Sequence, residues 1–149
     1  MVYFIIVIFA VVLDQAVKHL VMSVMALHQS IPIINEVFHI TYIHNTGAAF
    51  SLLQGQKVLL IGVPALFILV GLVYIFKHRS DRRRILLIAI ALIVGGGIGN
   101  LIDRISLGYV VDFFDFRVFP IFNIADIFVT IGCALLCVYV LFIDGKKRR

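Results

Sequence analysis

Charge is scarce in this sequence, and tryptophan is absent from it. Charged residues make up 14% of the 149 residues, whereas hydrophobic residues make up 62% and the mean hydropathy is +1.12. A water-soluble domain carries about 25% charged residues, so this chain lacks the polar surface that such a domain needs. The scarcity of charge therefore excludes a soluble globular protein and predicts an integral membrane protein.

Cysteine is also rare, and its placement does not indicate metal binding. The two cysteines, Cys133 and Cys137, lie one helical turn apart in an apolar run, and no C-x-x-C motif is present. Two thiols do not complete a zinc site, so we expect both side chains to pack in an apolar environment. His39 and His44 are five residues apart and would point to opposite faces of a regular strand. We therefore expect no metal site.

Four apolar runs are long enough to cross a membrane, which takes about 20 residues of helix. The first run begins at the N-terminus without the basic segment of a signal peptide and without a small-residue cleavage site, so we expect it to be retained. The length of the chain allows one membrane-embedded domain over residues 1–149. The predicted spans are residues 2–25, 58–76, 85–102 and 121–143.

The basic residues predict the orientation of these spans. The connector "KHRSDRRR" and the tail "DGKKRR" together hold nine of the thirteen Lys and Arg residues. Basic connectors stay in the cytoplasm, so both termini are predicted to be cytoplasmic and the other two connectors extracytoplasmic. Nucleic-acid binding is the alternative for such basic runs. It is less favoured, because topology already accounts for the charges and no aromatic residues are interleaved.

The two extracytoplasmic connectors have the composition of β-strands. The connector over residues 28–57 contains "VFHITYIHN", and the one over 104–120 contains "YVVDFFDFRVFP". Both stretches are rich in β-branched and aromatic residues. The predicted fold is thus an α-helical integral membrane protein with four transmembrane helices and a small extracytoplasmic β-sheet on the membrane surface.

The orientation brings scattered polar residues to the outer ends of the spans. In a helix, residues three and four apart share a face, which groups the polar residues at the end of the third span and at the start of the fourth. Ionisable groups in such segments usually face a bundle interior or a cavity. We expect one outer pocket to gather Asp14, Lys18, Asn45, Asn100, Asp103, Arg104, Asp112, Asn123 and Asp126.

Several of these residues also allow a purely structural interpretation. Asp14 and Lys18 could form only an i,i+4 ion pair within a buried helix. Asp103 and Arg104 could be an interfacial helix end with an arginine that reaches toward water. "HNTGAAF", which contains Asn45, could be only a turn.

Two further interpretations are structural. Gly95 and Gly99 in "GGGIGN" have the spacing of close helix packing in lipid, and they do not fit a nucleotide-binding loop. Asp115 and Glu36 are expected to be solvated loop charges.

Asp112 and Asp126 fit a structural interpretation least well. Asp112 is flanked by "VV" and "FF", and Asp126 by "IA" and "IF", so neither belongs to a solvated charge run. Two carboxylates that lie close together in a low-dielectric site do not both ionise easily, and one keeps a proton. Such a pair can act on a peptide, because the ionised member activates water while the protonated member polarises the carbonyl. No serine or cysteine has a plausible neighbouring base, which argues against a covalent nucleophile.

With these motifs, the chain resembles the bacterial lipoprotein signal peptidases, also called signal peptidase II. The resemblance covers nearly the whole chain and rests on five motifs in order. These are Asp14-Gln15-x-x-Lys18, Asn45-x-Gly47-x-Ala49-Phe50, Gly96 through Gly99-Asn100-x-x-Asp103-Arg104, Val111-Asp112-Phe113 and Phe122-Asn123-x-Ala125-Asp126. The stretch between Asp112 and Asp126 is shorter than in many relatives.

The resemblance implies an aspartic endopeptidase that removes signal peptides from diacylglyceryl-modified prolipoproteins, before the lipidated cysteine. It implies that Asp112 and Asp126 are catalytic. It also implies a set of residues that bind substrate or orient the pair, namely Asp14, Lys18, Asn45, Gly47, Asn100, Asp103, Arg104 and Asn123. It also implies a site at the outer face of the bacterial inner membrane, contact with membrane lipid, no metal or other cofactor, and inhibition by globomycin-type cyclic peptides. A monomer is expected, because the site needs residues of only one chain, and nucleic acid is not an expected partner.

Two other classes of function remain as alternatives. A small polytopic transporter or proton-relay protein could use Asp14, Lys18, Asp103 and Asp126 as a path. A continuous relay needs groups at several depths, whereas these acids gather at the outer end. A non-catalytic lipid-binding or scaffold protein would not need the paired carboxylates.

Overall fold

The computed structural model describes residues 1–47, 57–81 and 83–144, and four long apolar helices dominate it. Ala49 and Phe50 of the second motif, and the basic tail 145–149, lie outside the described residues. Each of the four helices is long and apolar enough to cross a membrane. They are α1 (Val2–Val24), α2 (Lys57–His78), α3 (Arg84–Ser106) and α4 (Ile124–Val138), which continues as a π-helix over Tyr139–Asp144.

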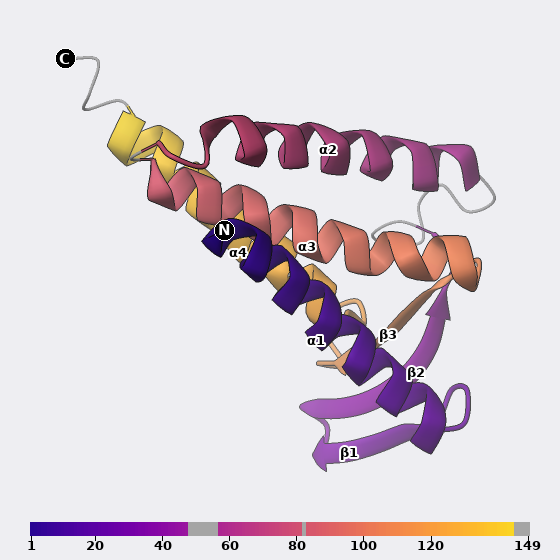
Figure 1. Cartoon of the computed structure of the whole chain (residues 1–149). Helices are drawn as coiled ribbons and strands as arrows, with labels where there is room; N and C mark the ends of the chain where they lie inside the picture. The colour runs from indigo at the N-terminus through magenta and orange to yellow at the C-terminus, as the bar shows by residue number, and fades with distance from the viewer. Residues whose placement is uncertain (48–56, 82, 145–149) are drawn as a thin grey trace.

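Helix α3 is the central element, since it packs against each of the other three helices (Figure 1). Its glycines allow this close approach. A Cβ on Gly95 would lie 2.7 Å from the Ala10 Cβ of α1, and one on Gly99 would lie 2.5 Å from the Asp14 carboxylate. Small residues let helix backbones approach closely in lipid. The packing role predicted for Gly95 and Gly99 is therefore confirmed.

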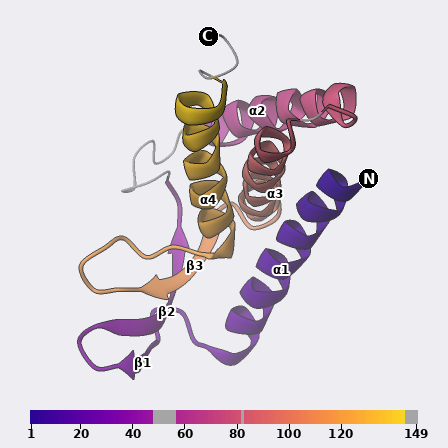
Figure 2. The ribbon, with the colours of Figure 1, turned by 90° about the vertical axis from the view of Figure 1, so that its left-hand side faces the viewer.

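A three-stranded antiparallel sheet lies at the end of the helices away from the N-terminus (Figure 2). Its order is β1 (Ser30–Ile34), β2 (Phe38–Asn45), β3 (Val110–Asp115). The predicted membrane fold of four helices and a small sheet is confirmed. A buried cluster joins the sheet to the end of α1, and it consists of Val21, Met25, Tyr42, Val111 and Phe113.

The largest differences from the predicted spans are at the end of α3 and the start of α4, and both concern polar residues. Helix α3 continues to Ser106 rather than ending at residue 102, so Asp103 and Arg104 lie within it. Helix α4 begins at Ile124 rather than 121, because Asn123 caps it. The Asn123 side chain accepts the backbone N–H of Asp126, while the Asp126 carboxylate accepts the backbone N–H of Asn123. This reciprocal arrangement is a capping box, which satisfies two N–H groups at a helix start.

Two expectations about side-chain surroundings are wrong. Asp115 is not a solvated loop charge: it ends β3, is only 4% exposed, and accepts hydrogen bonds from Thr41 and Arg117. The cysteines are not packed in the interior, because both Cys133 and Cys137 are exposed on α4. An apolar outer surface is favourable for a helix in lipid, so an apolar run does not tell which of its faces is buried.

Candidate active site

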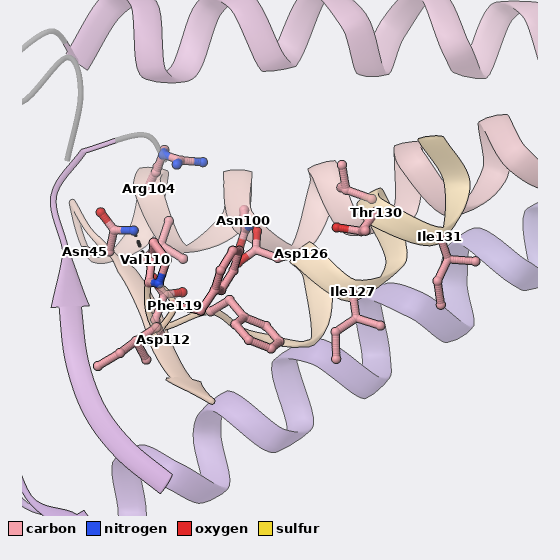
Figure 3. Close-up of a pocket in the computed structure, with 14 residues that line it drawn as sticks. Asn45, Asn100, Arg104, Val110, Asp112, Phe119, Asp126, Ile127, Thr130 and Ile131 are labelled. Atoms are coloured by element: carbon pink, nitrogen blue, oxygen red, sulfur yellow. Dashed lines mark hydrogen bonds between the residues drawn. The ribbon is translucent and has the colours of Figure 1, made fainter. Parts of the chain in front are cut away.

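A pocket of about 490 Å³ opens between β3, the end of α3 and the start of α4 (Figure 3). Its polar side consists of Asn45, Asn100, Arg104, Asp112 and Asp126. Its apolar side consists of residues 119–122, which precede α4, together with Ile127, Val129, Thr130 and Ile131 of α4 and Val110 of β3. The pocket thus presents two carboxylates beside an apolar wall.

Asn123 joins the two carboxylates of this pocket. Its side-chain Nδ2 donates to the Asp112 carboxylate at 2.6 Å, and its backbone N–H donates to the Asp126 carboxylate at 3.2 Å. Because Asn123 is fully buried and also caps α4, it cannot move without disturbing the helix start. The capping box therefore sets the position of Asp126 relative to Asp112.

The outer oxygens of the two carboxylates are held by two further amides. Asn45, the last residue of β2, donates to Asp112 at 2.9 Å, and Asn100 of α3 donates to Asp126 at 2.8 Å (Figure 3). Within the described part of the chain, neither carboxylate forms an ion pair. The pair is thus oriented by hydrogen bonds from neutral amides.

The surroundings of Asp112 favour its protonated form. Burial raises the pKa of Asp112 to about 7, and the nearby Asp126 charge also raises this pKa. The hydrogen bonds from Asn45 and Asn123 act in the opposite direction, because they stabilise the ionised form. A carboxyl group with such a pKa can hold or release a proton near neutral pH, as acid–base chemistry requires.

A second polar cluster lies behind the pocket, around the Lys18 ammonium group. Its Nζ lies 2.9 Å from the Asp14 carboxylate and 2.9 Å from that of Asp103. All three residues are at most 2% exposed. None of them is among the residues that line the pocket. The structural interpretation of Asp14 and Lys18 thus contains a correct element, because the two residues do pair at i,i+4. Asp103 is not an interfacial helix end, because it is buried and binds the same lysine.

Hydrogen bonds connect the Lys18 cluster to the residues around the pocket. Lys18 donates to the Asn100 side-chain oxygen at 2.9 Å, which leaves the Asn100 amide nitrogen free to bind Asp126. Asp14 accepts the backbone N–H of Ala125 in the first turn of α4 at 2.9 Å. Asp103 accepts the backbone N–H of Val111, next to Asp112, at 3.0 Å. The cluster therefore fixes the backbone next to Asp112 and next to Asp126.

Arg104 and Gly47 lie at the edge of the pocket next to Asn45. The Arg104 guanidinium donates to the Gly47 carbonyl at 3.3 Å, and the Gly47 N–H donates to the Asn45 side chain at 3.0 Å. The predicted turn at Asn45–Gly47 is present, and the same asparagine binds Asp112. The structure thus brings all ten residues predicted for the site together at one end of the bundle, in a pocket layer and a supporting layer.

Sequence reasoning missed two contributors to this arrangement. Gln15 donates to Asp103 at 2.8 Å and to the Gly99 carbonyl at 3.1 Å, and so completes the Lys18 cluster. The signal for it was present, because a glutamine beside Asp14 is costly in a membrane helix unless it finds partners. The apolar wall over residues 119–122 had no such signal, since nearly every segment of this chain is apolar.

The other polar residues that the structure describes do not form a metal-binding group. Among residues 1–47, 57–81 and 83–144, no three His, Cys, Asp or Glu side chains are grouped closely enough to hold a metal ion. His39 contacts Ser30 at 3.0 Å, and His44 stacks on Tyr109 with ring centroids 3.6 Å apart. The two histidines have separate partners.

Comparison with known proteins shows what this chain is similar to. The family described as Signal peptidase (SPase) II matches residues 6–142. The lipoprotein signal peptidase of Halothermothrix orenii is 49% identical over 136 residues, which cover 91% of this chain and 92% of that protein. The lipoprotein signal peptidase of Clostridioides difficile is 46% identical over 153 residues, which cover 99% of this chain and all of that protein.

The fold is also similar to that of solved structures. A bacterial membrane enzyme determined by the in meso method at 2.3 Å resolution superposes with a TM-score of 0.88 at 32% sequence identity. The superposition covers 99% of this chain and 92% of that enzyme. A second bacterial membrane enzyme, determined at 1.9 Å resolution, gives a TM-score of 0.84 at 33% identity.

Proposed function

The chain belongs to the signal peptidase II family, and on that premise we propose that it is an aspartic endopeptidase that removes signal peptides from diacylglyceryl-modified prolipoproteins. It cleaves before the lipidated cysteine, with Asp112 and Asp126 as the catalytic pair. The observation that carries this proposal is the single residue Asn123, which binds both carboxylates at the edge of one pocket. Two carboxylates held in this way, with one proton between them, are suited to peptide hydrolysis.

The chemistry uses water as the nucleophile. Asp112, whose pKa is raised to about 7 by burial, holds the proton and donates a hydrogen bond to the scissile carbonyl oxygen. The carboxylate of Asp126 takes a proton from water as the water oxygen bonds to the carbonyl carbon. The tetrahedral intermediate then breaks its C–N bond, and the leaving nitrogen receives the proton that Asp126 accepted. General acid–base assistance of this kind contributes about 10² to 10⁴ to the rate.

The other site residues have supporting roles in this proposal. Asn45, Gly47, Asn100, Arg104 and Asn123 line the pocket or orient the pair. Asp14, Lys18 and Asp103 hold the backbone on which the pair is mounted. The apolar side of the pocket, from Phe119 to Ile131, suits an apolar peptide segment beside a lipid anchor.

We place the site at the extracytoplasmic face of the bacterial cytoplasmic membrane, with both termini in the cytoplasm. The support is that the α2–α3 connection, with its basic residues, lies at the opposite end of the bundle from the sheet (Figure 1). A membrane-impermeant thiol reagent tests this orientation in a Cys133→Ser, Cys137→Ser background. Asn35→Cys should react from outside intact cells and Ser80→Cys should not, and the reverse pattern would contradict the orientation.

Three further elements of the proposal concern partners. The acyl chains of the substrate stay in the surrounding lipid while the scissile bond enters the pocket. Globomycin-type cyclic peptides compete for the same pocket. The enzyme acts as a monomer, because the site draws on one chain only.

A cleavage assay in detergent or lipid tests the function directly. The purified protein is given a diacylglyceryl-modified precursor and the same precursor without the lipid, and the new N-terminus is identified by mass spectrometry. We expect cleavage of the lipidated precursor only, with the lipidated cysteine as the first residue of the product. Folded protein that cleaves neither precursor would contradict the proposal and favour a transporter or a scaffold.

A further inference from the structure

The last residues of the loop between β3 and α4 form one wall of the proposed catalytic pocket. Its two ends are paired, because the backbone N–H of Phe114 donates to the Phe122 carbonyl at 2.8 Å and that of Phe122 donates to the Phe114 carbonyl at 3.2 Å. Residues 119–122 on the returning side of the loop line the pocket. The conformation of the short segment between the paired ends therefore sets the position of this wall.

The turn of this loop is strained at Arg117. Its φ is +63°, and the N–H of Val118 donates to the Phe116 carbonyl at 2.7 Å, which makes a γ-turn centred on Arg117. A γ-turn with positive φ is rare and strained for a residue with a side chain. Such a conformation persists only when the surroundings hold it in place.

Asp115 supplies the contacts that hold this turn. One carboxylate oxygen accepts the Arg117 backbone N–H at 2.8 Å. The other accepts the Arg117 guanidinium at 3.1 Å and the Thr41 hydroxyl at 2.8 Å. Burial alone would raise the pKa of Asp115, but the hydrogen bonds from Arg117 and Thr41 outweigh it and lower this pKa, so the group stays ionised and accepting. The turn is thus tied to β2 through Thr41.

Aromatic contacts couple the position of the turn to that of the pocket wall. The Phe116 ring stacks on Phe122 with centroids 5.9 Å apart and an interplanar angle of 4°. Phe119 packs edge-on against the same ring at 6.0 Å, and its side chain lies beside Asp126 and Asp112 in the pocket (Figure 3). A change in the turn at Arg117 would therefore move Phe119 relative to the two carboxylates.

We propose that Asp115 is a positioning residue of the peptidase: it holds the Arg117 turn and thereby sets the Phe119 wall that receives the apolar part of the substrate. This inference rests on the proposed peptidase function. Asp115 touches neither catalytic carboxylate, so it acts on substrate binding and leaves the acid–base chemistry intact. Its loss should raise KM and should leave kcat and the pH profile unchanged.

A set of variants separates this role from a general structural one. Asp115→Ala should raise KM for the lipidated precursor about tenfold, with kcat within about twofold, because the turn loses its support. Asp115→Asn keeps one acceptor for the Arg117 N–H and should give a smaller rise. Adding Arg117→Gly to Asp115→Ala should bring KM back toward the wild-type value, since glycine adopts positive φ without strain.

The matched control is Asp81→Ala. Asp81 also pairs with an arginine two residues later, Arg83, but this pair is exposed and lies at the other end of the bundle. The Asp81→Ala variant should leave both KM and kcat unchanged. An Asp115→Ala enzyme with wild-type KM, or with reduced kcat at unchanged KM, would overturn the inference. So would a double variant with Arg117→Gly that is no better than Asp115→Ala.

A second readout does not depend on peptidase activity. The chain has no tryptophan, so Phe119→Trp introduces a single fluorophore into the wall. Adding Asp115→Ala should shift its emission and lower its anisotropy, and adding Arg117→Gly as well should reverse both changes. Unchanged fluorescence on loss of Asp115 would overturn the inference. If wild type cleaves no lipidated precursor, the proposed function fails, and this experiment still decides whether Asp115 positions the wall.

Discussion

Two groups of carboxylates occupy the same end of this bundle, and they differ in what holds them. Asp14 and Asp103 share one cation, with Lys18 Nζ 2.9 Å from each, and all three side chains are buried away from the pocket. Asp112 and Asp126 are held by the amides of Asn45, Asn100 and Asn123, and they line the pocket.

The difference indicates how one residue type serves two purposes. Two carboxylates that share a buried cation form a fixed ion cluster, which contributes order to the structure. A buried carboxylate without an ion-pair partner keeps access to its protonated form, as the pKa of Asp112, raised by burial, illustrates. The buried ion cluster is the support, and the amide-bound pair is the candidate for chemistry.

Removing the shared cation should have the largest effect on stability. Lys18→Met leaves two buried carboxylates without a counter-ion, which costs about 3–5 kcal/mol when one partner of a buried pair is removed. We expect a large drop in the thermal unfolding midpoint in detergent, and loss of activity together with loss of folded protein.

The control for this variant is Lys77→Met, which removes an exposed lysine from the last turn of α2. Its unfolding midpoint should match that of wild type. A Lys18→Met protein that is as stable as the control would contradict the supporting role of the ion cluster.

Removing one amide from the proposed catalytic pair should have a smaller effect, visible in the pH profile of activity. The Asn45 hydrogen bond lowers the pKa of Asp112, so Asn45→Ala should raise this pKa above about 7. In the proposed mechanism Asp112 must carry the proton, so kcat/KM should fall as pH rises through this pKa. The alkaline limb should therefore move to higher pH, by up to about one unit for a single hydrogen bond.

Asn35→Ala is the matched control, since Asn35 is exposed in the turn between β1 and β2. Its alkaline limb should stay where the wild-type limb is. If the Asn45→Ala limb stays there too, or moves to lower pH, then the Asn45 amide does not tune the protonation of the pair.

The sequence was sufficient to predict the main architecture, because each part of it has a strong physical signal. Apolar runs of membrane length predicted the four helices, and β-branched and aromatic connectors predicted the sheet. The convergence of polar residues was predictable for a similar reason: Asp14, Asn100 and Asp126 are too costly in lipid to lie anywhere except a shared interior.

What the sequence did not predict depends on contacts between distant segments. Asp115 was predicted to be a loop charge because one of its partners, Thr41, is 74 residues earlier in the chain. Its other partner, the turn at Arg117, has no local sequence pattern that predicts it. The exposure of Cys133 and Cys137 was missed because lipid-facing and buried helix faces are equally apolar here. The division of the polar residues into an ion cluster and a catalytic pair likewise depends on which side chains reach Lys18.

The most direct test of the account is the kcat of Asp112→Asn and of Asp126→Asn on the lipidated precursor, measured together with the thermal unfolding midpoint of each. Asparagine retains the size of the side chain but cannot exchange the proton. We predict that each variant loses cleavage by more than about 10³-fold while its unfolding midpoint stays at or above the wild-type value. Either variant cleaving within about tenfold of wild type would show that its carboxylate is structural and would contradict the catalytic pair.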